Sequence, residues 1–325
     1  MNKTASGISR QTDIIVERVI RDEFCGPCAV TADAEGAFIV AEEFSHCIRK
    51  YSPAWDMLWK RGSKGNAPGE FVYPTGVTTD GKKRIYVTNR WNHRVDVLEP
   101  DGAFAFSWGR LGAKPEEMNE PWGICRSGEE TLLVVDRGNA RVLVYTTEGQ
   151  LKQIFGKGGI SPHFYESEQF KRNYHYQRWL KRVERLQTVE TFFHAFDFDV
   201  GQFEYPEQIA CTAEGYCHVT DRVSGHVTVF DSAGTYVRTE SRLLQDYMVP
   251  SPFSITAGDT GIVIGDERNQ MITVKRDSET CVIDLKKYSI KPTALCYSSS
   301  EKNLVIADAW QDAVFICRFE GEVTI

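Results

Sequence analysis

The sequence of 325 residues has no apolar run of the roughly 20 residues that a helix needs to cross a bilayer. Residues 1–13 are polar and lack the apolar core of a signal peptide. Positive charge is not in excess either. The net charge is −7, so no overall basic field draws the chain to nucleic acid or anionic lipid. These absences predict a protein without a transmembrane segment, and favour neither nucleic-acid binding nor membrane-surface contact.

Signatures of catalysis are also missing. No Ser-His-Asp order and no glycine-rich phosphate loop stands out. Cys25-Gly26-Pro27-Cys28 spells a thioredoxin-like tetrapeptide, but thioredoxin chemistry needs this motif at a helix N-terminus. Here Pro27 opens a repeat of short strands. His218 falls in an apolar strand-like run, where a histidine satisfied within the core is commoner than a ligand. We therefore predict no catalytic residue, cofactor or metal, and lean against an enzyme.

The nine cysteines are odd in number and scattered along strand-like runs. This usage suits reduced, buried thiols better than a disulfide framework. We expect a cytoplasmic protein.

The sequence does contain an internal repeat, clearest between residues 73 and 109. It consists of short β-rich runs separated by turns such as Asp80-Gly81 and Asp101-Gly102. Four such strands form one antiparallel sheet. Each unit opens with a proline and closes its second strand with an acid or an amide. The prolines are Pro27, Pro74, Pro121, Pro206, Pro252 and Pro292; the closing residues are Glu42, Asn89, Asp136, Asp221, Asp266 and Asp308.

Most of these spacings are about 40 to 47 residues, the period of a four-stranded propeller blade. The longer step from the third to the fourth unit lacks the marks of the repeat, so we interpret it as an insertion. The chain is predicted to be an all-β, six-bladed β-propeller forming a single domain over residues 1–325. The expected parts are 24–70, 71–117, 118–159, 200–248, 249–287 and 288–325 as blades one to six, 160–199 as a helical insertion and 14–20 as the strand that closes blade six. The tail 322–325 competes for that closing position.

The units resemble NHL repeats, whose pattern is roughly Pro-x-Gly-Ile, a turn, Ile-Tyr-Val-x-Asp, Asn-His-Arg-Ile and a Gly-Glu-Phe boundary. Residues 92–95 (Asn-His-Arg-Val) match the name-giving segment, and residues 139–142 match it with Ala for His. Gly69-Glu70-Phe71 matches the boundary. Blades five and six keep little of the pattern. The acids that close the second strands are expected to be structural, accepting backbone hydrogen bonds at the strand end.

In propellers, the segment entering the innermost strand and the loop between strands two and three lie on one face, the top face. Arginines and aromatic residues gather at these positions, and both types are enriched at the energetic centres of interfaces. The alternative is structural: arginines that bridge neighbouring blades and tryptophans that plug the channel mouth. The candidates for partner binding on this face are Arg90, Trp91, Trp122, Arg137, Glu207, Arg222, Arg268 and Trp310.

The insertion is rich in aromatic residues and carries an apolar stripe at helical spacing beside a basic flank. Long insertions of this kind are often lids or binding elements. Three interpretations compete: a helix packed over its own blade edge, an arm that docks a partner, and an interfacial membrane helix. The candidates for partner binding here are Phe170, Tyr174, Arg178, Trp179 and Arg182.

Three functions follow from these observations. We favour a scaffold that docks a protein partner through the top face and the insertion. An enzyme with a metal in the channel is the second possibility, because six-bladed hydrolases and lyases have this architecture; however, the residue before Gly26-Pro27, a glutamate in the lactonases, is Cys25 here. Binding of single-stranded RNA is the third, implied by some NHL propellers, although Glu43, Glu207 and Glu267 interrupt the basic ring.

Overall fold

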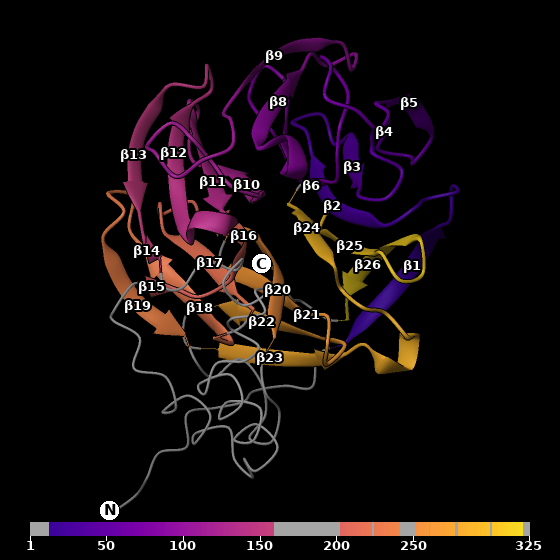
Figure 1. The fold of residues 1–325 in the computed structure, drawn as a ribbon. Helices are drawn as coiled ribbons and strands as arrows, with labels where there is room; N and C mark the ends of the chain where they lie inside the picture. The colour runs from indigo at the N-terminus through magenta and orange to yellow at the C-terminus, as the bar shows by residue number, and fades with distance from the viewer. Residues whose placement is uncertain are drawn as a thin grey trace, which may run out of the picture.

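The computed structural model describes residues 13–158, 202–222, 224–240, 251–259, 261–276, 279–299 and 301–320. Six four-stranded antiparallel sheets stand around one axis as the blades of a propeller (Figure 1). The all-β, six-bladed fold predicted from the repeat is therefore confirmed. The expected helix falls within residues 160–199, which lie outside the described residues. No helix among the described residues is long and apolar enough to cross a membrane.

Each of the first five blades uses four consecutive strands, numbered from the channel outward. Blade one has β2 (Pro27–Ala32), β3 (Phe38–Glu42), β4 (Cys47–Tyr51) and β5 (Met57–Arg61); blade two has β6 (Pro74–Thr79), β7 (Ile85–Asn89), β8 (Arg94–Leu98) and β9 (Phe104–Trp108). Blade three has β10 (Pro121–Arg126), β11 (Thr131–Asp136), β12 (Arg141–Thr146) and β13 (Leu151–Phe155). Blade four has β16 (Pro206–Cys211), β17 (Cys217–Asp221), β18 (His226–Phe230) and β19 (Tyr236–Glu240); blade five has β20 (Pro252–Ala257), β21 (Gly261–Asp266), β22 (Met271–Arg276) and β23 (Glu279–Asp284).

Blade six is assembled from both ends of the described chain. It contains β24 (Ala294–Ser298), β25 (Asn303–Asp308) and β26 (Ala313–Phe319), with β1 (Ile14–Ile20) as its outermost strand. β1 runs antiparallel to β26, with Ile14 opposite Phe319 and Ile20 opposite Val314. This pairing closes the ring. The described residues also contain three short 3-10 helices: η1 (Arg90–Asn92), η2 (Arg137–Asn139) and η3 (Lys286–Tyr288).

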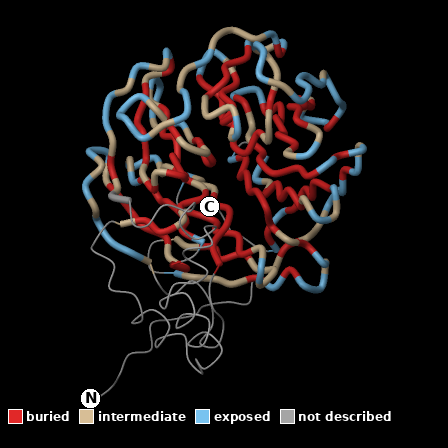
Figure 2. Tube along the Cα trace, viewed as in Figure 1, coloured by how far each residue is buried: buried red, intermediate tan, exposed pale blue. Residues whose placement is uncertain are grey.

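The core lies between the blades rather than within any one of them (Figure 2). Strands such as β3 and β7 are buried along their whole length, because both faces of their sheet are covered by neighbouring blades. The outermost strands are largely exposed, as β5 illustrates. A sheet that is apolar on both faces cannot be stable alone, so packing blade on blade provides the stability of the fold.

Hydrogen bonds join neighbouring blades at the start of the innermost strands. Thr75 Oγ1 donates to the Pro121 carbonyl (3.1 Å), and Thr293 Oγ1 donates to the Pro27 carbonyl (3.2 Å) across the junction between blades six and one. The thiol of Cys28 similarly donates to the Pro74 carbonyl (3.0 Å). The residue after each opening proline is therefore a position at which blades can be linked.

The residues that define the repeat also connect one blade to the next. His93 Nδ1 accepts the backbone N–H of Glu120 at 3.1 Å, and His46 accepts that of Tyr73 at 3.1 Å. At the ring junction Asp312 stands at this position and accepts the N–H of Gly26 (2.7 Å). The strand-closing acids act within one blade, and their predicted structural role is confirmed, because each accepts a backbone N–H from the segment just before the opening proline of its own blade. The acceptors are Asp136, Asp221, Asp266 and Asp308.

The segment between β13 and β16 departs from the pattern of the other blades. Where blades one and two have single parallel bridges, Lys64 with Phe71 and Leu111 with Met118, this connection has β14 (Lys157–Gly158) paired in parallel with β15 (Gln202–Phe203). The two described ends of the long connection therefore lie side by side.

The bond across the ring junction leads to a testable prediction. In Thr293→Val the shape of the side chain is kept, but its hydrogen bonds to Pro27 and Ala307 are lost, and Ala309 N–H loses its acceptor. We expect a loss of about 2 kcal/mol in the free energy of unfolding, measured by chemical denaturation. Thr239→Val, on the exposed edge strand β19, is the matched control. It should change the free energy of unfolding by less than about 0.5 kcal/mol. Equal effects of the two changes would contradict the role of this bond.

Candidate functional site at the top face

Two kinds of segment meet at one end of the propeller: the loops between second and third strands and the segments that enter the innermost strands. Backbone hydrogen bonds tie them together, for example Arg90 N–H to the Tyr73 carbonyl (3.2 Å) and Gly138 N–H to the Asn119 carbonyl (2.7 Å). We call this end the top face. Its loops are residues 43–46, 90–93, 137–140, 222–225, 267–270 and 309–312.

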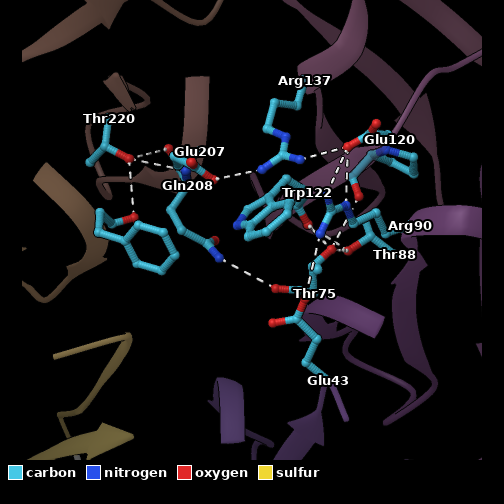
Figure 3. A network of polar contacts seen from close by, with 12 residues as sticks. Glu43, Thr75, Thr88, Arg90, Glu120, Trp122, Arg137, Glu207, Gln208 and Thr220 are labelled. Atoms are coloured by element: carbon cyan, nitrogen blue, oxygen red, sulfur yellow. Dashed lines mark hydrogen bonds and ion pairs between the residues drawn. The ribbon is translucent and has the colours of Figure 1, made fainter. Parts of the chain in front are cut away.

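Arg137 is the centre of a polar network on this face (Figure 3). It is 3% exposed and forms ion pairs with Glu120 (2.6 Å) and Glu207 (3.5 Å). Its guanidinium carbon also lies 3.8 Å from the centre of the Trp122 ring and 4.7 Å from that of Tyr205. The guanidinium thus links blades three and four through both charge and aromatic contacts.

Arg90 extends the network to blade one. It pairs with Glu120 at 3.0 Å and with Glu43 at 3.4 Å, and its guanidinium carbon lies 4.7 Å from the centre of the Trp122 ring. Trp122 is therefore in contact with two arginines and is itself 7% exposed. The network joins four consecutive blades and makes this part of the top face rigid.

The three carboxylates of the network have different environments. The hydrogen bond from Arg137, together with the charges of Arg137 and Arg90, outweighs burial and holds the pKa of Glu120 below its usual value. Burial raises the pKa of Glu43. Glu207 is 0% exposed, and burial, only partly opposed by Arg137, raises its pKa to about 7. Glu207 is thus a carboxyl group that gains or loses its charge near neutral pH.

Aromatic side chains continue this cluster toward blade five. The ring of Phe253 lies 6.3 Å from that of Trp122 in an edge-to-face arrangement, and Phe253 is buried. The exposed Arg222 places its guanidinium carbon 5.2 Å from the centre of the Phe253 ring. Five of the predicted arginine and aromatic residues therefore form one continuous series of contacts over blades two to five: Arg90, Trp122, Arg137, Arg222 and Phe253.

Three other aromatic side chains project into solvent. Phe44 is 55% exposed, Trp91 54% and Trp310 67%. They are nevertheless held by neighbours. The Trp91 ring lies 4.9 Å from that of Tyr73, and Trp310 donates its indole N–H to Glu267 and has Lys291 4.1 Å from its ring centre. These three rings are open to solvent on the loops of blades one, two and six.

The structure separates the residues predicted from sequence into three groups. Arg90, Trp122, Arg137 and Glu207 meet in the buried or half-buried network. Trp91, Arg222, Arg268 and Trp310 are exposed around it. The third group lies outside the described residues: Phe170, Tyr174, Arg178, Trp179 and Arg182.

Sequence reasoning missed two members of the network, Glu120 and Tyr205. Both stand immediately before an opening proline, and Glu120 has a positive φ of 47°. The shared position before the opening proline is the sequence signal by which both could have been found.

The inner strands enclose a central cavity of about 310 Å³. Residues of all six innermost strands line it, apolar ones such as Val77 and Ile124 together with polar ones such as Gln208. Among the described residues there is no group of three His, Cys, Asp or Glu side chains arranged to hold a metal ion.

The Cys25-Gly26-Pro27-Cys28 motif leads into a strand, and burial raises the pKa of the Cys28 thiol well above its usual value.

Comparisons with known proteins agree with this architecture. Residues 71–98, in blade two, match the family model described as NHL repeat. No curated protein sequence matches the chain significantly. The chain is similar in structure to a virginiamycin B lyase from Staphylococcus aureus, with a TM-score of 0.58, 10% identity and coverage of 95% of this chain and 99% of the lyase.

Two further structures show the same likeness. A streptogramin B lyase has a TM-score of 0.57 and 14% identity, with 90% of this chain and 78% of the lyase covered. The WD40 repeats of RRP9 have a TM-score of 0.55 and 12% identity, with 90% and 80% covered. At such low identities the likeness concerns the fold alone, and this fold is shared by lyases and WD40 repeats.

The environment of Glu207 predicts a dependence of stability on pH. In the unfolded chain Glu207 loses its proton near its ordinary pKa of 4.5, whereas the folded protein retains it up to about pH 7. Between these values the folded state binds more protons, so stability falls as pH rises. Glu207 should therefore lower the free energy of unfolding by on the order of 2 kcal/mol between pH 5 and pH 8. We expect Glu207→Gln to abolish this pH dependence, as measured by chemical denaturation at each pH. Parallel pH profiles for the variant and the wild type would show that Glu207 does not titrate in this range.

Proposed function

We propose that this NHL-repeat propeller is a non-catalytic scaffold that docks a protein partner through its top face and the 160–199 insertion. The observation that carries the proposal is the exposure of Phe44, Trp91 and Trp310, each more than half exposed on loops of three different blades. Large aromatic side chains are enriched where binding energy is concentrated.

The contacts that hold the exposed Trp91 and Trp310 side chains in place favour binding. Trp91 packs on Tyr73, and Trp310 is held by Glu267 and Lys291. Because the rings are already restrained, a partner that covers them loses little side-chain entropy in doing so. The buried network around Arg137 keeps the loops in place, as expected for residues that support a binding surface rather than contact the partner.

The charges of the top face favour protein over RNA. Arg90 and Arg137 are paired with carboxylates from Glu43, Glu120 and Glu207. Such arginines are already neutralised and are poor donors to phosphate, on which RNA affinity largely depends. Arg222 and Arg268 are exposed, and Arg268 directly follows Glu267 in its loop, so charges of both signs occur on this rim, as suits a protein surface.

The place of the insertion in the chain supports its participation. Its described flanks, β14 and β15, correspond to the connections that enter blades two and three. Those shorter connections reach the top face, since Asn92 and Asn139 in its loops donate to the Gly65 and Gly112 carbonyls. Tyr205, a member of the Arg137 network, stands two residues after β15. The described C-terminal end of the long connection therefore lies close to the network in the chain.

A paired substitution tests the docking surface. The double variant Trp91→Ala, Trp310→Ala is expected to lower the recovery of a bound partner at least about tenfold, measured by quantitative mass spectrometry after affinity purification from native extract. The matched control, Leu58→Ala with Tyr216→Ala, removes side chains that are also exposed but lie on the outer strand β5 and on the loop between β16 and β17. Partner loss in the control alone would place binding elsewhere.

A second variant addresses the insertion. Residues 159–202, between the paired Gly158 and Phe203, are replaced by the six-residue connection 112–117, which lies between the equivalent pair Leu111 and Met118. Unchanged recovery of the partner would remove the insertion from the proposal. Strongly salt-dependent binding of single-stranded RNA, lost on Arg222→Glu with Arg268→Glu, would overturn the assignment to a protein partner.

A further inference from the structure

Three cysteines far apart in the sequence meet beside the central cavity. Cys125 is the last residue but one of β10 in blade three, Cys211 ends β16 in blade four, and Cys217 begins β17 opposite Cys211. The sulfur of Cys211 lies 3.3 Å from that of Cys125 and 2.9 Å from that of Cys217. Cys211 is thus a shared neighbour of two thiols, one in its own blade and one in the adjacent blade.

The cluster is reachable from solvent. Cys125 and Cys211 are half-buried and line the central cavity, whereas Cys217 is only 2% exposed. Cys211 also lines a second cavity, of about 920 Å³, formed by the loops between first and second strands at the opposite end from the top face. A small oxidant therefore meets Cys125 and Cys211 before Cys217.

The junction between blades three and four, although Arg137 bridges it at the top face, lacks one hydrogen bond that the other junctions have. At each of the other five junctions, a hydroxyl or thiol donates to a carbonyl at the start of the next innermost strand. The donors are Cys28, Thr75, Thr220, Ser254 and Thr293. At this junction Trp122 follows the opening proline, and the described residues of β10 make no such bond to Pro206.

We propose that Cys125 and Cys211 form a site of reversible oxidation, in which peroxide converts the two thiols into a disulfide linking blades three and four. Hydrogen peroxide first oxidises one thiol to a sulfenic acid and leaves as water. The second thiol then attacks this sulfur, and its proton leaves with the displaced hydroxide as a second water. Two S–H bonds are replaced by one S–S bond, and two electrons pass to the peroxide.

Cys217 provides the route by which this disulfide can rearrange. Its thiol lies against Cys211, so thiol–disulfide exchange would transfer the bond to Cys211 and Cys217 and return Cys125 to the reduced form. The hydrogen bond with Cys125, together with burial, raises the pKa of Cys211 well above its usual value. Thiolate is therefore scarce at neutral pH, and oxidation should accelerate as the pH rises.

The test uses the full-length protein treated with hydrogen peroxide and then denatured in the presence of an alkylating agent. The oxidised protein is expected to lose two of its nine titratable thiols, and peptide mapping without reductant should give a cross-linked Cys125–Cys211 peptide. The link closes a loop of 86 residues in sequence separation. The thermal midpoint should therefore rise by roughly 5–10 °C and return on reduction by dithiothreitol.

Substitutions identify the pair. Cys125→Ser should abolish the rise in midpoint, whereas Cys296→Ser, at another cysteine lining the same cavity, should retain it. In Cys217→Ser the Cys125–Cys211 peptide should remain and be the only product. A wild-type protein that gives only sulfinic or sulfonic acids, or no linked peptide, would overturn the proposal even if a variant failed to fold. Thiols that react only after a chelator is added would indicate a bound soft metal instead, and would also overturn it.

Discussion

The structure depends on one constraint: every sheet is apolar on both faces, so no blade is stable until it has a neighbour on each side. A row of such sheets would leave two apolar faces exposed, and only a closed ring removes both. Closure is achieved by pairing β1 with β26, which places Ile14 opposite Phe319 at the two ends of the described chain. Asp312 and Thr293 then repeat at this junction the contacts that join the other blades.

The closed ring determines what meets at the top face. Arg137 and Glu207 are far apart in sequence but adjacent in space, because their loops belong to neighbouring blades. The face has two layers with different roles. A buried layer of arginines, carboxylates and Trp122 connects the loops of blades one to four, Trp91 lies exposed beside Arg90 of this layer, and Trp310 is exposed on the loop of blade six. The proposed docking surface relies on such support beneath its exposed aromatic side chains.

The sequence predicted the blade count well because its signal is periodic. Each opening proline and strand-closing acid has a local physical purpose, so it recurs even where the rest of the repeat has diverged. The sequence did not show in the same way that Trp122 is buried whereas Trp91 is exposed. Both lie in candidate loop positions, but Trp122 is covered by Arg90 and Arg137 from two blades. Such coverage depends on how neighbouring blades pack.

The thiol cluster is a second case in which contacts between neighbouring blades could not be predicted from the repeat. Cys125 and Cys211 occupy ordinary positions near the ends of innermost strands, and their scattered spacing suggested inert buried thiols. Their proximity arises because β10 and β16 are adjacent in the ring although the long connection separates them in sequence. Glu120 was missed for a related reason, since its partners Arg90 and Arg137 come from two different loops.

The most direct test of ring closure is a double-mutant cycle between Ile14 and Phe319, using Ile14→Ala, Phe319→Ala and the double variant. The free energy of unfolding of each protein is measured by chemical denaturation. Because the two buried side chains lie opposite each other in β1 and β26, we predict an interaction energy of about 1 kcal/mol or more. Strictly additive losses would mean that the two ends of the described chain are not packed together, and would contradict the closed ring on which the top face depends.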